Sequence, residues 1–241
     1  MGSKTQVPDE FSDEEKAYAQ VVVQVVAQIV TGLSRTLVLR TEVVLHDLTR
    51  FPHTIVAIAD PMTGRGPGGP PTDLGLRTFS ENPIEDLIGY RTRVEGGPEM
   101  RSSSLFFRAP SGRAVVALCM NSDVTELQQV RRILNGFVST EQEDLSPPTV
   151  VQETFPASVE SLTQGILNDA ITASGVEVGL MKKAHKVRVV GELQRRGFFT
   201  LRESVDLAAK NLEVSRYTIY NYLNELQQES PGEPAGHSQR A

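Results

Sequence analysis

The stretch from Val205 to Tyr222 is the feature that most constrains how this chain folds. Ala209 is small at a point where two helices must cross closely, and Val214 is apolar in the turn between them. Ser215 stands where a side-chain oxygen can accept a backbone N–H and begin a helix. Ile219 then follows at helical spacing, so it can pack back onto the first helix. The pattern predicts two short helices joined by a tight turn.

The outer face of the second predicted helix is rich in hydrogen-bond donors and aromatic edges. A helix with a buried inner stripe and such an outer face suits the major groove of DNA. The alternative is a plain helical hairpin, but spacing, cap and outer face together favour a DNA-binding helix-turn-helix. Glu213 counts against it, because a tight turn favours Gly there. The predicted DNA-binding residues are Ser215, Arg216, Tyr217, Thr218, Tyr220 and Asn221.

The formal charge of the chain is −6, and it is unevenly distributed. Residues 182–226 contain nine Lys or Arg and five Asp or Glu, a net charge of +4, so the rest of the chain carries −10. This distribution is expected when only one part of a protein meets phosphate. Five basic side chains are expected to add sequence-independent affinity for DNA: Lys182, Lys183, Lys186, Arg195 and Arg196.

The first 140 residues have the pattern of a mixed domain. Helical periodicity at 14–34 is followed by runs of strand character separated by turn residues. The order of elements predicts an α+β domain with a mostly antiparallel sheet and flanking helices, followed by an all-α domain. The predicted strands are 37–48, 53–59, 91–94, 105–108 and 113–120, with a hairpin at 110–112, a short helix at 83–88 and a longer one at 123–138.

Composition suggests where the domains begin and end. Residues 141–158 are polar and contain Pro147 and Pro148, which is typical of a linker. The last residues are rich in Pro, Gly, Ser and Gln, which is typical of disorder. The predicted parts are a flexible N-terminus at 1–13, an α+β domain at 14–140, a linker at 141–158, a connecting helix at 159–174, a helix-turn-helix domain at 180–227 and a disordered tail at 228–241.

Both halves carry runs that resemble one family. They are residues 41–48, 55–58, 63–65, 71–76 and 118–121 in the first half, and 214–216 and 218–223 in the second. In this order they resemble the YheO-like family, bacterial regulators of the D-arginine utilisation regulator type that join a PAS-like domain to a helix-turn-helix. The resemblance implies a transcriptional regulator whose domain at 14–140 is a PAS-like sensory domain. The chain departs from the family at Leu201–Ser204, where a Lys-Gly-Ala-like entry to the helix-turn-helix is usual.

Polar residues of the predicted PAS-like domain are candidates for its ligand site. Glu42 and His46 share one face of a strand and Asp47 points to the other, so a zinc site is poorly supported. Two uses stay open: polar lining of a ligand cavity, or hydrogen bonds to loop backbone. Thr72 and Asp73 suggest either an Asx-type turn, which is favoured, or a ligand contact. The tentative ligand-binding residues are therefore Glu42, His46, Thr72 and Asp73.

Catalytic and membrane signals are weak. The run 64–69 lacks the Gly-Lys-Ser/Thr ending of a phosphate loop and is interpreted as a turn. Cys119 lies in an apolar run and is predicted to be a small core residue, and as a lone cysteine it favours a cytoplasmic location. The apolar run 21–30 is shorter than a membrane span. No enzyme, metal, cofactor or membrane association is expected.

Together these patterns predict a cytoplasmic transcription factor that binds operator DNA. Its PAS-like domain would sense a small effector, such as an amino acid, or a protein partner. One recognition helix rarely gives enough affinity, so a homodimer or higher homo-oligomer is expected. The helices at 14–34 and 159–173 are the natural dimer elements. The alternatives are a sensor or scaffold that acts through protein–protein contacts and, without a visible catalytic constellation, a small-molecule enzyme.

Overall fold

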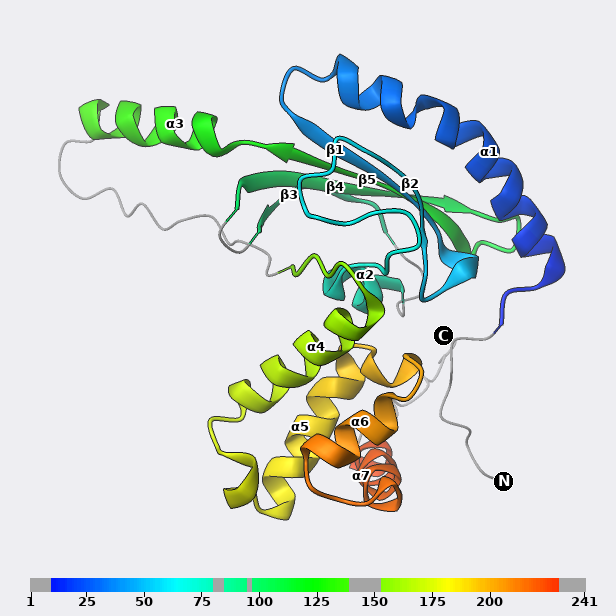
Figure 1. The fold of residues 1–241 in the computed structure, drawn as a ribbon, viewed down its shortest axis with the longest axis vertical. Coiled ribbons are helices and arrows are strands. Elements are labelled where there is room, and N and C mark those ends of the chain that lie inside the picture. Colours follow the sequence, from blue (N-terminus) through cyan, green and yellow to red (C-terminus); the bar gives the residue numbers. More distant parts are fainter. Residues whose placement is uncertain (1–9, 80–84, 95–96, 139–152, 230–241) are drawn as a thin grey trace, which may run out of the picture. The chain divides into compact units, whose positions relative to one another are not determined.

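The computed structural model describes residues 10–79, 85–94, 97–138 and 153–229 (Figure 1). The chain divides into two compact units, residues 1–164 and 165–241. Most of the predicted disordered tail, of the predicted flexible N-terminus and of the predicted linker lies outside the described residues. The predicted start of the tail at 228 was two residues too early, because residues 228 and 229 belong to the last helix.

A five-stranded antiparallel sheet forms the centre of the first unit, in the order β2-β1-β5-β4-β3. The predicted fold class is confirmed, and the predicted hairpin joins β4 to β5 with Gly112 at φ +87°. The strands are β1 (Thr41–Asp47), β2 (Ile55–Ala59), β3 (Leu87–Arg93), β4 (Glu99–Arg108) and β5 (Ala114–Asp123).

Helix α1 (Asp13–Thr36) covers one face of this sheet (Figure 1). It begins with a capping box in which Ser12 and Glu15 exchange side-chain and backbone hydrogen bonds. Ala19 and Val26 on its inner face pack in one apolar cluster with Leu45 of β1. The apolar run 21–30 was predicted to be too short for a membrane span, whereas the whole of α1 is long and apolar enough to cross one. Its inner face is nevertheless buried against the sheet.

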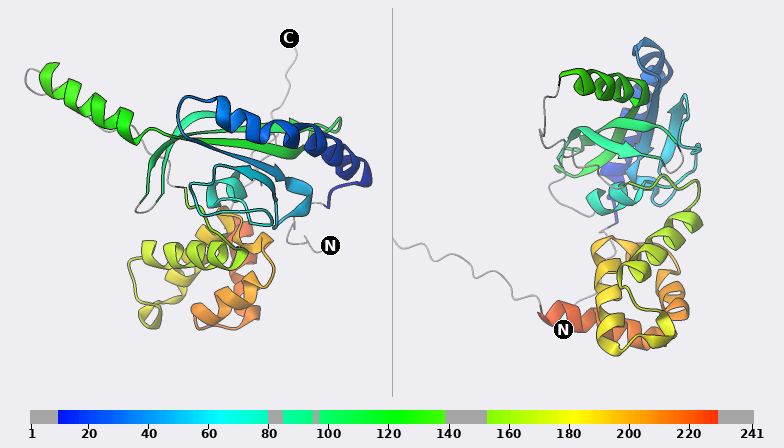
Figure 2. Two further views of the ribbon diagram at one scale, coloured as in Figure 1. Left: turned by 45° about the horizontal axis from the view of Figure 1, so that its top comes forward. Right: turned by 90° about the vertical axis from the view of Figure 1, so that its left-hand side faces the viewer.

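The opposite face of the sheet is covered by α2 (Asp73–Phe79) and by the loop that leads to it (Figure 2). The sequence predicted only a turn at the start of this helix, because its seven residues include Gly75 and give little periodicity. The first two residues of the helix predicted at 83–88 lie outside the described residues, and the prediction is wrong at its end, since Leu87 and Ile88 belong to β3. Their pairing with β4 outweighs the weak helical signal of the segment.

Helix α3 (Thr125–Val138) follows β5 and projects away from the sheet (Figures 1 and 2). A helix was predicted at 123–138, and its apolar side chains are exposed rather than packed on the sheet. The exposed apolar residues are Leu127, Val130, Ile133, Leu134 and Phe137.

The second unit is all-α, as predicted. Helix α4 (Val159–Ala173) enters it and is followed by α5 (Lys183–Arg195), α6 (Ser204–Asn211) and α7 (Arg216–Glu229). Gly197 ends the α5 region at φ +71°, a conformation that Gly adopts without strain. The core of this unit is apolar and includes Val190, Leu193, Phe198, Leu212, Ile219 and Leu223.

Candidate effector cavity and DNA-binding surface

Glu42 anchors the loop that follows β2. Its Oε1 accepts hydrogen bonds from Arg65 Nη2 at 2.8 Å and Asn121 Nδ2 at 2.9 Å. Its Oε2 accepts from the backbone N–H groups of Met62 and Thr63 and from the Thr63 hydroxyl. Burial opposes ionisation, but Arg65 and these donors outweigh it, so the pKa of Glu42 is below its ordinary value. The structure thus gives Glu42 a complete set of partners within the chain.

His46 lies on the same face of β1 as Glu42, as predicted, and lines the cavity described below. Its Nδ1 is 2.8 Å from the Thr54 hydroxyl. Burial, and then the charge of Arg65, lower the pKa of His46 to about 3, so the ring is neutral at physiological pH. Asp47 has a structural role, because its Oδ1 accepts from the N–H and the hydroxyl of Thr49.

Thr72 and Asp73 hold a segment that lies far away in the sequence. The Thr72 hydroxyl accepts from Gly75 N–H at the start of α2 and donates to Glu153 Oε1 at 2.6 Å. Asp73 Oδ1 accepts the N–H of Thr154, also at 2.6 Å. Residues 153 and 154, near the end of the predicted linker, are therefore fixed to the first unit by hydrogen bonds to Thr72 and Asp73.

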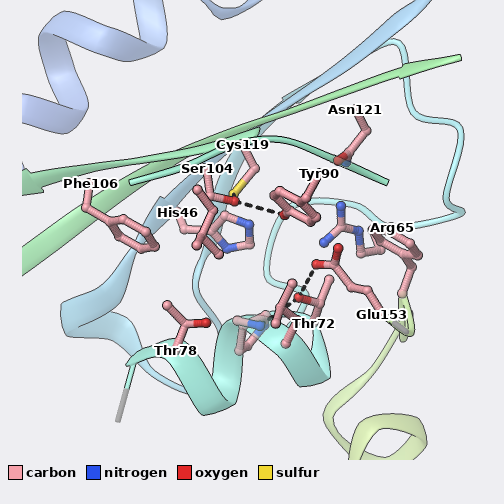
Figure 3. A pocket seen from close by; sticks show the side chains of 15 residues that line it. His46, Arg65, Thr72, Thr78, Tyr90, Ser104, Phe106, Cys119, Asn121 and Glu153 are labelled. Carbon is pink, nitrogen blue, oxygen red and sulfur yellow. Dashed lines mark hydrogen bonds between the residues drawn. The ribbon is translucent and has the colours of Figure 1, made fainter. Parts of the chain in front are cut away.

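A small cavity lies between this face of the sheet, α2 and residues 153–155 (Figure 3). Its volume of about 20 Å³ is room for one or two water molecules. Apolar walls include Leu74, Leu87 and Phe106. Polar side chains facing it come from every surrounding element and include His46, Arg65, Thr72, Thr78, Tyr90, Ser104, Cys119, Asn121 and Glu153.

Burial shifts the pKa values of several side chains that line the cavity. Burial raises the pKa of Glu153 to about 7, against the opposing effects of the Thr72 hydroxyl and Arg65. Burial also raises the pKa of Cys119 to about 11 and that of Tyr90 above its ordinary value. Cys119 was predicted to be a core residue. It instead lines the cavity, and its Sγ lies 3.3 Å from the Ser104 hydroxyl.

Sequence reasoning missed the cavity residues Arg65 and Glu153. Arg65 lies in a loop that composition marked only as a turn, and Glu153 lies in the predicted linker. The Arg65 guanidinium lies over the Phe155 ring, 4.9 Å from its centroid. The sequence offered one signal that this segment packs against the domain: the aromatic Phe155 lies two residues after Glu153 in an otherwise polar linker. Among the described residues, no group of three potential metal ligands comes together.

The second unit presents the predicted helix-turn-helix as α6 and α7. Ser215 caps α7 by accepting the N–H of Thr218 at 3.1 Å. Glu213 in the turn has φ +52°, which explains why Gly would be favoured there. Glu203, in the segment that departs from the family pattern, also has a positive φ of +60°. Ala209, Ile219 and Tyr222 are buried as predicted.

The outer face of α7 is exposed in this unit. Tyr217 and Tyr220 are 73% and 41% exposed, and Arg216 and Asn221 are exposed beside them. Arg216 Nε lies 3.0 Å from Asp206 on α6. Both partners are largely exposed, so this ion pair is weak and its release for a phosphate or base would cost little.

Four of the five basic residues predicted to contact phosphate have partners inside the chain. Lys186 Nζ donates to the carbonyl of Leu212 at 2.7 Å, so it satisfies the end of α6. The other three form ion pairs: Lys183 with Glu225, Arg195 with Glu192, and Arg196 with Asp169.

Comparisons with known proteins match both units. Residues 16–139 match the family model of a YheO-like PAS domain, and residues 162–224 match that of an HTH domain. A Haemophilus influenzae protein described as uncharacterized is 28% identical over 221 residues, which are 91% of this chain and 96% of the relative. The uncharacterized protein YheO of Escherichia coli is 29% identical over 82% of each chain. The transcriptional regulator DauR of Pseudomonas aeruginosa is 24% identical over 83% of this chain and 92% of its own. No solved structure matches the chain.

Proposed function

Since the chain belongs to the YheO-like PAS family and carries a helix-turn-helix domain, making it a DNA-binding transcriptional regulator, we propose that its PAS domain senses a small polar metabolite. Binding of this effector, an amino acid or a similar compound, changes the affinity for operator DNA in the cytoplasm. The observation that supports sensing is the cavity between the sheet and α2, which is lined by polar groups from several elements.

The effector contacts in this proposal differ from those expected from sequence. His46 and Thr72 line the cavity and can contact a ligand. Glu42 and Asp73 instead hold the surrounding loops, because their oxygens accept hydrogen bonds from the chain. An amino acid is larger than the cavity of about 20 Å³, so α2 or residues 153–157 must move when it binds.

The test of sensing is calorimetry on the full chain with a panel of metabolites, followed by operator titrations with any compound that binds. We expect one class of compound to change operator affinity by a factor that corresponds to about 1–3 kcal/mol, and DNA to change effector affinity by the same factor. If no compound that binds alters operator affinity, the sensing function is wrong.

We propose further that α7 reads the operator. Arg216, Tyr217, Tyr220 and Asn221 face the bases, and Ser215 and Thr218 lie near phosphate. These six residues form the exposed side and the first turn of α7, so no rearrangement of the unit's core is needed to present them.

Binding of the full chain to a duplex selected from a random pool tests this assignment. Asn221→Ala should cost about 1–3 kcal/mol and relax the preference at one base pair. Arg40→Ala removes an exposed arginine of the first unit and serves as the control, with no loss expected. An unchanged affinity for the Arg216→Ala, Asn221→Ala double variant would show that another surface binds DNA.

We propose a homodimer that forms through the first unit. Of the two helices expected to mediate it, α4 has its apolar residues buried within the chain, including Leu162, Ile166 and Leu167. By contrast, α1 exposes an apolar stripe at helical spacing, with Val21, Val25 and Ile29 each more than half exposed. A second copy of this chain is the partner favoured here, because the helix-turn-helix needs two copies for a two-fold operator.

Sedimentation of the full chain separates a dimer from a monomer. Val25→Glu should shift it toward the monomer, because a charge cannot be buried unpaired in an apolar interface. Ile88→Glu places the same charge at a 62% exposed site on β3 and should leave the mass unchanged. A monomeric wild-type chain, or a dimer indifferent to Val25→Glu, would contradict the α1 interface.

A further inference from the structure

One carboxylate oxygen in the cavity has no hydrogen-bond partner. Glu153 is only 9% exposed, and its Oε1 accepts from the Thr72 hydroxyl. Its Oε2 is buried and is the one buried side-chain polar atom without a partner in the part of the chain that the structure describes. The carboxylate points toward the cavity (Figure 3). A buried carboxylate normally has partners for both oxygens, so this atom points to a missing donor.

The nearby groups do not supply that donor. The Tyr90 hydroxyl lowers the pKa of Glu153 weakly but makes no direct hydrogen bond to Oε2, and its own partner is the Ser104 hydroxyl at 3.2 Å. Arg65 lines the same cavity, but its Nη2 donates to Glu42 and its Nε to Thr63. The positive charge of Arg65 is therefore balanced by Glu42, which is fully buried with it.

The charge of the site follows from these pairings. Arg65 and Glu42 cancel each other, and the deeply buried ring of His46 stays neutral. Among the described residues, Glu153 is left as the one carboxyl group lining the cavity that is not paired with a basic side chain, and its ionised form is negative. Burial raises its pKa to about 7, so a cation bound beside it favours the ionised form. An anionic group placed beside Glu153 would meet a like charge in a site largely closed to water, where repulsion is strong. A cationic nitrogen would satisfy both the charge and the unpaired oxygen.

We propose that Glu153 is the recognition group for a cationic nitrogen of the effector, an ammonium or guanidinium group, which donates to Oε2. This assignment rests on the proposed sensing function and specifies its ligand class. The hydroxyls of Tyr90 and Ser104 lie across the cavity and provide further partners for the same polar head, while Leu74 and Phe106 contact its carbon atoms.

The position of Glu153 in the chain gives this contact a second consequence. Residues 153 and 154 are held by Thr72 and Asp73, and α4 begins five residues later, at Val159. A ligand that engages Glu153 therefore acts on the segment that leads directly into α4. No other described residue that lines the cavity, apart from Phe155, lies in that segment.

Four size-matched probes test the ligand class on the full chain: propylamine, propylguanidine, propanol and propionate. Binding is measured by ligand-observed NMR for the wild type and for Glu153→Gln, which keeps the shape and the acceptor for Thr72. The cationic probes should bind the wild type at least tenfold more tightly than propanol or propionate. Glu153→Gln should remove that preference, and Glu153→Asp, which keeps the charge, should retain part of it.

Glu126→Gln is the matched control, because it makes the same change at an exposed acid on α3 and should leave the preference unchanged. A wild type that prefers propionate, or binds none of the cationic probes, overturns the proposal. So does a cationic preference that survives in Glu153→Gln. An effector from the metabolite panel that shifts operator affinity equally in wild type and Glu153→Gln would overturn the role of Glu153 and leave the sensing function intact.

Discussion

Glu153→Gln should change how the stability of the first unit depends on pH. Burial raises the pKa of this carboxyl from 4.5 to about 7, while the unfolded chain keeps the ordinary value. A group whose pKa is raised on folding favours the folded state fully below the unfolded value of 4.5. That contribution is lost as pH rises to the folded value of about 7. Glu153 should therefore destabilise the unliganded protein progressively between these two pH values.

The magnitude follows from the same two pKa values. Each pKa unit corresponds to about 1.4 kcal/mol, so the full effect is about 3 kcal/mol, most of which develops between pH 5 and pH 8. Other shifted groups of the cavity do not titrate in that window, since the pKa of His46 is about 3 and that of Cys119 is about 11. The Tyr90 pKa is raised further from the window.

Amide hydrogen exchange of peptides from β1 and β5 measures this effect in the full chain. The protection of wild type relative to Glu153→Gln should fall by about a hundredfold from pH 5 to pH 8, because about 3 kcal/mol corresponds to that factor. Any effect of the Gln amide that does not depend on pH drops out, because only the change with pH is compared. The control Glu126→Gln should show the same pH dependence as the wild type. Parallel pH profiles for wild type and Glu153→Gln would refute the reasoning, since they would mean that the carboxyl is not desolvated.

Three further predictions, each tested by substitution, concern other parts of the structure. Glu42→Gln leaves Arg65 buried without a counter-charge and should cost about 3–5 kcal/mol in urea unfolding. Asp60→Asn, which breaks an exposed ion pair, should cost less than about 1 kcal/mol, and equal costs would contradict the burial argument. Ser215→Ala should lower the stability of α7 by about 1 kcal/mol, measured by hydrogen exchange of its amides. Ser215→Asp also supplies a capping oxygen and should restore that stability, and a failure to do so would contradict the capping role. Glu203→Gly should raise the free energy of unfolding by up to about 1 kcal/mol, because a φ of +60° strains a residue that has a side chain and does not strain Gly. A lower melting temperature for the variant would show that the Glu203 side chain is needed.

Elements with strong periodicity could be predicted from sequence. Strands β1 and β5 could be predicted from runs of β-branched and apolar residues bounded by turn residues, and α1 and the helix-turn-helix from apolar residues at 3.6-residue spacing. Helix α2 has seven residues, too few to establish a period, and most residues of β3 are only partly buried, so its apolar pattern is weak. The helix predicted at 83–88 failed for that reason, because tertiary pairing with β4 decides the conformation of Leu87 and Ile88.

The polar cavity was predictable only in part. Glu42 and His46 could be placed on one strand face, because alternation along a strand is a local property. Whether each side chain contacts a ligand or the chain itself depends on residues that are distant in the sequence. Glu42 contacts the chain, because Arg65, 23 positions later, donates a hydrogen bond to it. Glu153 meets Thr72 across 81 positions, through a segment whose composition resembles a linker. No local pattern records a contact of that kind.

The free energies of the two hydrogen bonds at residues 153 and 154 are large enough for this segment to transmit effector binding to the DNA-binding unit. Allosteric coupling between two sites is typically about 1–3 kcal/mol. A hydrogen bond to a charged group contributes about 1.5–3 kcal/mol, so either the Thr72–Glu153 bond or the Asp73–Thr154 bond is enough to account for it. A cation that competes with Thr72 for Glu153 would weaken the first bond, whereas one that joins it would strengthen the hold on this segment. The proposed coupling does not require the sheet to change in either case, since it would act through the two hydrogen bonds that precede α4.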